Sequence, residues 1–355
     1  MVRIIRHSDL PELAHASEGS GGAPAAELSP PPLLSIIVVS YNTRDMTLAC
    51  LASVMAETRA ASYELIVVDN ASSDGSAEAI AALGDRVRFM ALTENIGFAR
   101  ANNLAAHKAR GDFLLLLNPD TVVLDGAIDQ LASFASANPA AGIWGGRTLF
   151  GDLTLDPTSV WARMTPWSMT TRALGLDHAF ASSRLFNPEG YGGWARDSMR
   201  AVDIVTGCFL MIRAELWQRL DGFDRAFFMY GEEADICLRA AKLGARPLFT
   251  PTATIIHYGG ASERTQAGKV EKLFRAKVTL MHRHWSAPAR AFGKAMLMVW
   301  PVSRLAAATL LGRASQAAMW REVWRHRATW LAGYDQPQPA AAGNIANLDA
   351  GQLAR

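Results

Sequence analysis

The stretch that decides the fold is DFLLLLNPDT, residues 112–121. Five apolar residues run through it without a break and stop at a polar turn that contains proline. A short apolar run that ends in a turn is typical of a strand buried on both faces of a sheet. Ligands of open α/β sheets bind beyond the carboxyl ends of such strands, so Asn118 and Asp120 are candidate ligand-binding residues. Taken alone, this stretch is interpreted more simply as a turn before a helix.

Two similar strands are predicted upstream, at residues 34–40 and 64–68, where β-branched and apolar side chains dominate. A helix is predicted after each of them, over residues 43–57 and from Ser76, and a short strand follows at 87–91. Strands that alternate with helices predict βαβ units with right-handed crossovers and a mostly parallel sheet. The sequence therefore predicts an α/β fold.

Polar residues follow each of the long predicted strands, namely Tyr41 and Asn42, Asp69 and Asn70, and Asn118 and Asp120. The carboxyl ends of parallel strands meet at one edge of a sheet, so we expect these side chains to converge on one crevice. Helix capping is the simpler role for Asp69 and Asp74. The sequence contains neither Gly-x-Gly-x-x-Gly after the first strand nor Gly-x-x-x-x-Gly-Lys-[Ser/Thr], which excludes a Rossmann dinucleotide site and a P-loop.

A second polar centre is predicted in FFMYGEEADICLR, residues 227–239. Helical spacing begins near Glu232, so Glu232 and Glu233 fall in a first turn, where two acids can simply compensate the helix dipole. The functional interpretation is that one of them is a general base, because the aromatic residues before Gly231 would desolvate it. Asp235 and Arg239 are four residues apart and are predicted to form an ion pair.

The remaining sequence gives weaker signals. Aromatic residues between 151 and 200 are expected mainly to pack locally. Strands are predicted at residues 201–205 and 247–256, and the second ends at His257, which is either a satisfied side chain or a metal ligand. The three cysteines show no Cys-x-x-Cys spacing, which favours a reducing compartment without a disulfide framework or a zinc site.

Charge is distributed unevenly along the chain. Residues 269–327 hold twelve Lys or Arg and two acids, which leaves 23 basic and 31 acidic residues elsewhere. We predict a disordered lead-in (1–32), an α/β domain (33–268, in halves 33–122 and 123–268), a basic amphipathic helical extension (269–332) and a disordered tail (333–355). The lead-in lacks the apolar core of a secretory signal.

The extension predicts an anionic membrane surface as a partner. Its apolar segment from Ala291 to Gly312 is long, but Pro301 and Arg304 argue against a membrane-spanning helix. A helix that lies flat on the membrane places neither Pro301 nor Arg304 inside the bilayer. Its basic side chains contact the headgroups, and its apolar side chains insert among the acyl chains. Packing on the rest of the protein is the competing interpretation.

Five motifs occur in order along the chain: SIIVVSYN (35–42), VVDNASSDG (67–75), ENIGFA (94–99), LNPD (117–120) and FMYGEEADICLR (228–239). With these motifs, the sequence resembles an inverting GT-A glycosyltransferase of family 2, in the bacterial rhamnosyltransferase-like branch. The resemblance covers residues 34–285. It implies a GT-A fold whose first half binds a nucleotide-sugar and whose second half carries the base.

The resemblance also implies a role for each matching residue. Tyr41, Asn42 and Asp69 would contact the nucleotide base and ribose, and Asn95, Asn102 and Asn118 would contact the sugar-diphosphate. Asp120 and His257 would bind the metal. Glu233 would be the general base, with Glu232 beside it. Asn118 replaces the first acid of the family's Asp-x-Asp motif, so Asp120 is the motif carboxylate that remains for Mg²⁺ or Mn²⁺. Glu233 is one methylene longer than the Asp usual at the base position.

The implied reaction is a single displacement with inversion at the anomeric carbon, driven by the base and by a metal that neutralises the leaving diphosphate. The expected donor is dTDP-L-rhamnose, and the expected acceptor is a glycan or lipid-linked glycan of bacterial cell-surface polysaccharide synthesis. No nucleic-acid partner is expected. The segment from Gln316 to Trp320 lacks the Arg of the processive Gln-x-x-Arg-Trp motif, so transfer is expected to be non-processive.

We expect the enzyme to be cytoplasmic and peripheral on the inner face of the cell membrane. Three alternatives stay open at this point. One is a sugar transferase with a UDP-hexose donor, and another is a nucleotidyltransferase, although no Gly-rich basic loop for a triphosphate is present. The third is a catalytically inactive sugar-binding or scaffold relative, which the Asn118 replacement allows.

Overall fold

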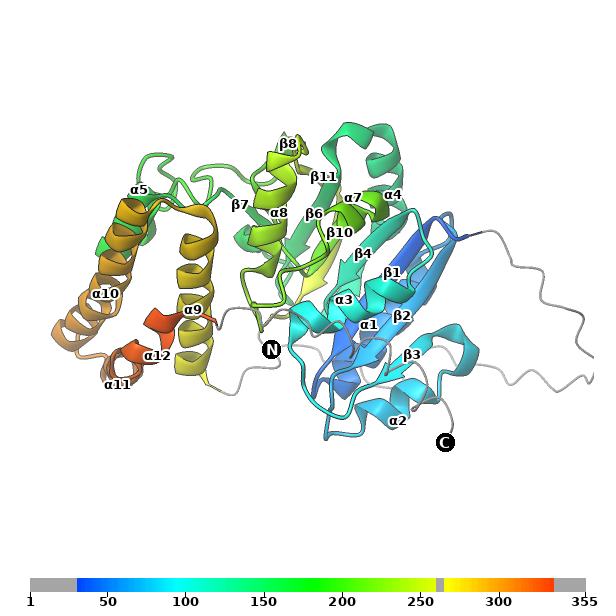
Figure 1. Cartoon of the computed structure of the whole chain (residues 1–355), viewed down its shortest axis with the longest axis horizontal. Helices are drawn as coiled ribbons and strands as arrows, with labels where there is room; N and C mark the ends of the chain where they lie inside the picture. Colours follow the sequence, from blue (N-terminus) through cyan, green and yellow to red (C-terminus); the bar gives the residue numbers. More distant parts are fainter. Residues whose placement is uncertain (1–30, 260–264, 335–355) are drawn as a thin grey trace, which may run out of the picture.

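The computed structural model describes residues 31–259 and 265–334. Most of the predicted lead-in and tail therefore lies outside the described residues. One sheet organises the fold, with strands in the order β3-β2-β1-β4-β10-β6-β11-β5 (Figure 1). Their bounds are β1 Leu34–Ser40, β2 Tyr63–Asp69, β3 Arg88–Ala91, β4 Phe113–Leu117, β5 Thr121–Val123, β6 Ile143–Leu149, β10 Phe209–Arg213 and β11 Leu248–His257.

The parallel core predicted for the N-terminal half is confirmed. Strand β1 pairs in parallel with β2, with Ser40 opposite Asp69, and with β4, with Val38 opposite Leu117. All five residues of β4 are buried, and they alternate between the two hydrophobic clusters on either side of the sheet. Burial on both faces explains the unbroken apolar run. The three strands end at one edge, as their sequence pattern predicts.

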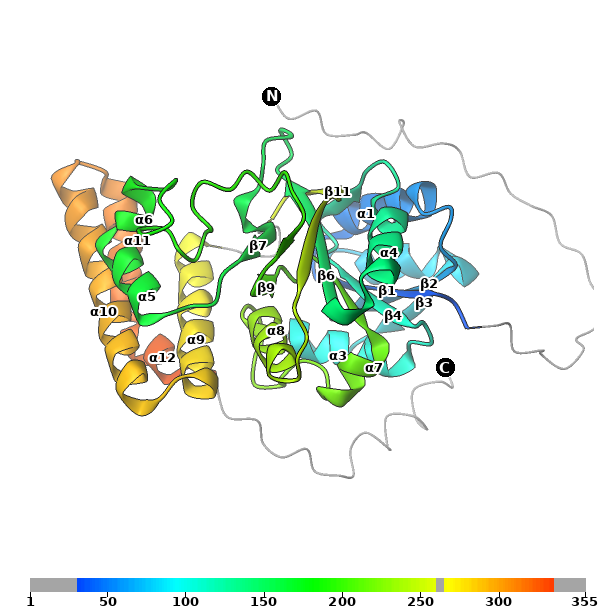
Figure 2. The ribbon, with the colours of Figure 1, turned by 90° about the horizontal axis from the view of Figure 1, so that it is seen from above.

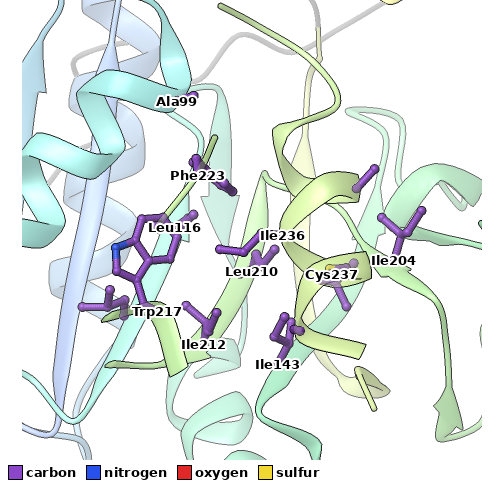
Figure 3. Packing of buried hydrophobic residues seen from close by; sticks show 14 of the residues in the cluster. Ala99, Leu116, Ile143, Ile204, Leu210, Ile212, Trp217, Phe223, Ile236 and Cys237 are labelled. Carbon is purple, nitrogen blue, oxygen red and sulfur yellow. The ribbon is translucent and has the colours of Figure 1, made fainter. Parts of the chain in front are cut away.

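Helices cover both faces of the sheet (Figure 2). One face carries α1 Arg44–Glu57, α2 Ser76–Ala81 and α4 Ala127–Ala137, and the other carries α3 Phe98–Lys108, α7 Ala214–Arg219 and α8 Glu232–Lys242. Figure 3 shows the cluster on the second face, where Leu116, Leu210 and Ile212 of the sheet gather with Trp217 of α7 and Ile236 of α8. This packing fixes α8, and with it the carboxyls at its start, against the sheet.

The C-terminal half of the sheet is mixed. Strand β10 runs antiparallel to β4 and β6, whereas β11 is parallel to β6 and antiparallel to β5. The single strand predicted at 201–205 is wrong, because the segment forms β8 (Arg200–Ala201), paired with β11, and β9 (Ile204–Val205), paired with β7 (Val160–Trp161). Between them the Asp203 backbone N–H donates to the Tyr191 hydroxyl at 2.9 Å instead of to a neighbouring strand.

Six helices form what we call the helical subdomain, which lies beside the sheet in Figures 1 and 2. They are α5 Pro166–Leu174, α6 Leu176–Ala179, α9 Gln266–His284, α10 Ala287–Leu310, α11 Ala314–Arg325 and α12 Arg327–Ala332. Helix α5 packs on α10, and α9 contacts α8 as well as α10, α11 and α12. Buried Phe274 packs against Trp330 with ring centroids 5.1 Å apart. Segment 151–200, predicted to be less regular, thus supplies two of these helices.

The predicted boundaries of the extension differ from those of the helices. The division between residues 268 and 269 falls within the first turn of α9, and the chain stays packed through Tyr334, which is 7% exposed. Pro301 lies inside α10 without ending it. Within residues 31–259 and 265–334, none of the helices combines the length and the apolar character that crossing a membrane requires.

Candidate active site

Asp69 and Asn42 shape the edge of the sheet where β1 and β2 end. Asp69 is 1% exposed, and its Oδ2 accepts from the Ser72 N–H at 2.9 Å, while its Oδ1 is buried without a partner. Asn42 has a left-handed backbone (φ 53°), and its Oδ1 accepts from the Ser73 N–H at 2.7 Å. The two side chains therefore hold the 72–73 loop in place, and Asp69 keeps one oxygen for a ligand. Tyr41 precedes them and is half-buried.

Asn95 organises the turn that leads into α3. Its Oδ1 accepts from the Gly97 N–H at 2.9 Å and from Asn70 Nδ2 at 3.0 Å. Asn102 lies deeper, at 1% exposure, and its Nδ2 donates to the Phe98 carbonyl at 2.9 Å within α3. The amides are thus part of the scaffold of this turn, and their contacts with a sugar-diphosphate stay a prediction.

Gly97 joins this turn to the segment in front of α8. Its φ is +85°, and an added Cβ would lie 2.6 Å from the Phe228 carbonyl oxygen. The Phe98 N–H donates to that same oxygen at 2.8 Å. Glycine is required here because a side chain would be strained and would also clash with backbone. The contact ties the donor side of the site to the segment that carries the carboxyls.

Asp120 and His257 meet beyond the ends of β4 and β11. His257 Nε2 lies 3.5 Å from Asp120 Oδ1 and 3.5 Å from Asn118 Nδ2, and His257 Nδ1 lies 3.8 Å from Asp156 Oδ2. Burial lowers the pKa of His257, but the facing Cys208, Asp120 and Asp156 outweigh burial and raise that pKa well above its ordinary value. The acidic neighbours favour the protonated imidazole, so a metal ion that binds through Nε2 would displace a proton from it.

The same cluster offers few ligands for a metal ion. Among the residues that the structure describes, no three His, Cys, Asp or Glu side chains converge as a preformed metal site. Asp120 and His257 supply two ligand atoms close together, and the buried Asn118 Oδ1 has no hydrogen-bond partner. Mg²⁺ is commonly held by one or two protein carboxylates and completes its shell with substrate phosphates and water. The donor set fits a cation that is shared with a diphosphate.

Glu232 and Glu233 open α8 after a left-handed turn at Tyr230 (φ 68°) and Gly231 (φ 89°). Glu232 is 4% exposed, and the Oε2 atoms of both glutamates are buried without a partner. Burial raises the pKa of Glu232 well above its ordinary value, and the charge of Glu233 raises it further. Burial also raises the pKa of Glu233, which backbone N–H groups and the charge of Lys277 lower. Carboxyls with perturbed pKa values and unpaired oxygens are candidates for acid–base chemistry.

Asp235, the third acid of α8, has a structural role. The predicted ion pair with Arg239 is present at 2.6 Å, and Asp235 Oδ1 also lies 2.8 Å from His284 Nε2 of α9. Asp235 is 1% exposed. The contact with His284 joins α8 to α9, whereas the ion pair with Arg239 lies within α8. Glu232 and Glu233 remain as the carboxyls with unpaired oxygens at the start of α8.

Unpaired buried atoms coincide with the predicted site. Nine buried side-chain nitrogen or oxygen atoms of the described residues lack a hydrogen-bond partner, and four of them belong to Asp69, Asn118, Glu232 and Glu233. Buried polar groups are nearly always paired, so each unpaired one requires an explanation. A ligand bound at this edge of the sheet would supply the missing hydrogen-bond partners.

Comparison with known proteins identifies the family of the chain. The family described as "Glycosyl transferase family 2" matches residues 35–217, just over half of the chain. The chain belongs to glycosyl transferase family 2. The chain is 29% identical over 242 residues to "O-antigen biosynthesis protein RfbC" of Myxococcus xanthus, covering 66% of this chain and 18% of that protein, so it spans less than a fifth of that relative's length.

Two further relatives match this glycosyltransferase over most of their own length. It is 26% identical over 291 residues to "N-acetylglucosaminyl-diphospho-decaprenol L-rhamnosyltransferase" of Mycobacterium tuberculosis H37Rv, covering 73% of this chain and 88% of that protein. It is 25% identical over 245 residues to "Rhamnosyltransferase WbbL" of Escherichia coli K12, covering 66% and 86%.

A solved structure gives the fold of this family-2 glycosyltransferase. The mannosyltransferase PcManGT of Pyrobaculum calidifontis, solved in complex with GDP-Man and Mn²⁺, superposes with a TM-score of 0.52 at 18% identity over 86% of both chains. At this identity the likeness concerns the fold alone, and it confirms the predicted GT-A architecture.

Some residues of the site were missed by sequence reasoning. Asp156 and Cys208 flank His257, although neither belongs to a motif. Asp156 lies 101 positions before His257 in the sequence and also accepts from the Thr158 N–H at 2.8 Å, which looks like an ordinary turn. No local pattern in the sequence indicates these contacts.

Proposed function

We propose that this glycosyltransferase transfers one sugar per encounter from a nucleotide-sugar to a hydroxyl of a glycan or lipid-linked glycan, with inversion. The observation that carries the proposal is the buried carboxyl pair of Glu232 and Glu233, with two oxygens unpaired. The Phe98–Phe228 hydrogen bond of 2.8 Å links their segment to the donor side of the site. A base with these properties suits the removal of a proton from an alcohol.

Glu233 is the general base in this proposal. Its carboxylate accepts the proton of the acceptor hydroxyl as that oxygen attacks the anomeric carbon, and the bond from this carbon to the diphosphate oxygen breaks. The nucleoside diphosphate leaves with the bonding electron pair, and the configuration of the carbon inverts. Glu232 stays protonated beside the base. Tyr41, Asn42 and Asp69 bind the nucleotide in this arrangement, and Asn95, Asn102 and Asn118 line the path of the diphosphate.

A divalent cation, Mg²⁺ or Mn²⁺, fits the Asp120 and His257 pair, whose nearest atoms are 3.5 Å apart. When bound, such an ion neutralises charge that develops on a departing diphosphate. Asp156 supports His257 from the other side of the ring, at 3.8 Å. The relative PcManGT was solved with GDP-Man and Mn²⁺, which favours a metal here as well.

The proposed donor is dTDP-L-rhamnose. Support comes from two relatives named as rhamnosyltransferases, one of which acts on a decaprenol-linked acceptor according to its name. The test is a panel of dTDP-, UDP- and GDP-sugars incubated with the purified full chain and lipid-linked or alkyl glycoside acceptors. Nucleoside diphosphate release and product formation from dTDP-L-rhamnose are expected. Preference for a UDP-hexose would overturn the donor, and inactivity with every donor would favour a sugar-binding relative.

We further propose that the helical subdomain rests on an anionic membrane at the inner face of the cell membrane. Large apolar side chains are exposed on its outside, among them Trp167, Phe292, Val302, Leu310 and Leu311, the last two at 87% and 64% exposure. Apart from Trp167 of α5, these residues lie in the basic stretch of residues 269–327, which holds twelve Lys or Arg and two acids. Apolar side chains flanked by basic ones suit an interface with anionic lipid. Such a position would bring the site near lipid-linked acceptors.

A further inference from the structure

Three large apolar side chains are exposed in the two segments that follow β6 and β11. Phe150 and Leu153 lie in the turn after β6, and Leu153 is 62% exposed. Tyr258 directly follows His257, the last residue of β11, and is 38% exposed. Single exposed apolar residues need no explanation, but several in neighbouring segments beside a functional site indicate a surface that a ligand or partner covers.

Both segments leave the sheet at the edge that carries the candidate active site. Strands β4 and β6 are each antiparallel to β10, so they run in the same direction, and β11 is parallel to β6. The ends of β6 and β11 therefore lie at the same edge as Asn118 and Asp120, which follow β4. In the order of the sheet, β4 separates them from β1 and β2, whose ends carry Asn42 and Asp69. A nucleotide bound at β1 and β2 leaves this half of the edge to the acceptor.

The turn after β6 is a hairpin whose tip has a defined shape. The Phe150 N–H donates to the Thr154 carbonyl at 2.8 Å, and the Leu153 N–H donates to the Phe150 carbonyl at 2.9 Å. Leu153 has a left-handed backbone (φ 66°), which is uncommon for a bulky residue and favours glycine at this position of a three-residue hairpin loop. An exposed leucine is thus held here against its backbone preference.

The ring of Tyr258 lies on this tip. A Cβ added at Gly151 would lie 2.8 Å from Cε1 and 3.0 Å from Cδ1 of the ring, so glycine is required for the ring to rest on the loop. The Tyr258 N–H also donates to the Asp120 carbonyl at 3.0 Å. The ring is therefore supported along one side by the hairpin and is fixed through its backbone to the candidate metal site.

The far end of the hairpin is joined to the same site. The Asp156 N–H donates to the Thr148 carbonyl of β6 at 3.1 Å, and Asp156 Oδ2 lies 3.8 Å from His257 Nδ1. The hairpin and the end of β11 thus contact each other at two places, Asp156 with His257 and Gly151 with Tyr258. These contacts form the surface from described residues alone, without a ligand.

The proposed base approaches the same edge from α8. A Cβ added at Gly207 would lie 3.6 Å from the Glu233 Cβ. The carbonyl of the next residue, Cys208, accepts from the Asn118 N–H at 3.1 Å. Glu233 is therefore close to the segment that pairs with the end of β4, and an acceptor whose hydroxyl lies at Glu233 has the surface around Tyr258 on the same half of the edge.

The chemistry of this surface suits a sugar ring. One face of a pyranose carries mainly C–H groups, which pack on the face of an aromatic ring while the hydroxyls stay available for hydrogen bonds. Asp152, also exposed at the tip, is held by the N–H and hydroxyl of Thr154 at 3.0 and 2.6 Å. Carboxylate oxygens accept hydrogen bonds from hydroxyls. An acid at the tip also opposes contact with an anionic membrane, which attracts basic residues.

We propose that Tyr258, supported by Gly151, forms a subsite that binds a sugar ring of the acceptor by stacking, with Phe150 and Leu153 at its border. The subsite holds and orients the acceptor, and no bond is made or broken there. This inference rests on the proposed function, because it takes the acceptor to be a glycan.

The direct test measures binding without transfer. The full chain is mixed with the methyl glycosides of glucose, galactose, N-acetylglucosamine and rhamnose, and saturation-transfer NMR records which sugar protons contact the protein. Signals concentrated on the C–H protons of one ring face are expected for at least one glycoside. Tyr258→Ala should weaken its binding by about tenfold, the effect of losing one aromatic contact. Binding of none of the four, or equal binding to Tyr258→Ala, would overturn the subsite.

Matched variants separate stacking from general disturbance. Tyr258→Phe keeps the ring and should bind within about threefold of wild type. Gly151→Ala keeps Tyr258 but displaces its ring, and it needs no left-handed backbone, so it should weaken binding as Tyr258→Ala does. Phe180→Ala removes a comparably exposed aromatic side chain after α6 and should leave binding unchanged. An equal loss in Phe180→Ala, or no loss in Gly151→Ala, would count against the assignment.

Kinetics provide the second readout. With an acceptor that supports turnover, Tyr258→Ala should raise the KM for the acceptor by about tenfold, while kcat and the KM for the donor stay within about threefold of wild type. A purely structural role would instead lower the melting temperature and change the donor KM as well, and that result would overturn the subsite.

Failure of the two proposals can be told apart, because the NMR measurement needs neither a donor nor turnover. Glycoside binding that depends on Tyr258, together with no transfer from any donor, would support the subsite and overturn the proposed function. Transfer with an acceptor KM that is unchanged in Tyr258→Ala would overturn the subsite alone.

Discussion

Replacing Glu233 by Gln should lower kcat by about 10²–10⁴, the range that loss of a general base produces, which is about 3–5 kcal/mol in activation free energy. The change is nearly isosteric, and the buried Oε2 has no partner to lose, so the effect isolates basicity. Burial and the charge of Glu233 raise the pKa of Glu232 well above its ordinary value, which favours its neutral form and makes it less available as a base. Donor affinity should persist, because Asp69 and the 72–73 loop lie on other elements.

The assay combines initial rates of nucleoside diphosphate release with calorimetric titration of the donor. Glu232→Gln is the matched control, because it exchanges one neutral group for another and should reduce kcat by less than about tenfold. A Glu233→Gln enzyme within tenfold of wild type would refute the reasoning. So would a larger loss in the control, which would move the role of base to Glu232.

Four further outcomes are expected. Gly97→Ala should cost about 1–3 kcal/mol of folding stability and reduce activity, because it forces a side chain into a left-handed conformation and onto the Phe228 carbonyl; an unchanged melting temperature would contradict this. Excess chelator should abolish transfer, and Mg²⁺ or Mn²⁺ should restore it; full activity in chelator would exclude the metal. Glu232→Gln should stabilise the protein increasingly from pH 5 to pH 8, measured by thermal unfolding. The pKa of Glu232 is higher in the folded protein than in the unfolded chain, so the wild-type protein keeps its full stability below the unfolded pKa. It loses stability as the pH rises toward the folded pKa, whereas Gln does not titrate and avoids this loss. Anionic vesicles at low salt should float the full chain but less of the Leu310→Ser/Leu311→Ser variant; equal flotation of both, or none, would count against the membrane surface.

The strands of the sheet were predictable where the residues of a single strand form a recognisable apolar run. Strands β1, β2 and β4 are buried on both faces, so their apolar runs are unbroken, and parallel pairing then brings Asp69 and Asn118 to one edge. The start of α8 was predictable for a similar reason, since Gly231 and two acids form a local helix-start pattern.

Other features depend on contacts that no local pattern carries. The strand predicted at 201–205 is split because Asp203 bonds to Tyr191, twelve residues away. The helix predicted from Thr43 begins at Arg44, and the Thr43 hydroxyl lies 3.1 Å from that of Thr47 and caps no backbone N–H. Lys277 appears in the sequence as one more basic residue of an amphipathic helix. Its hydrogen bond of 3.2 Å to Glu189, 88 positions earlier, follows from the packing of α9 in the helical subdomain.

The central claim is a single displacement at the anomeric carbon, and the stereochemistry of the product tests it most directly. The measurement is ¹H and ¹³C NMR of the purified product formed with the preferred donor, reading the anomeric coupling constants of the transferred sugar. We predict the configuration opposite to that of the donor, because one base and one attacking hydroxyl at this site lead to one inversion. A product that retains the donor configuration would contradict the account.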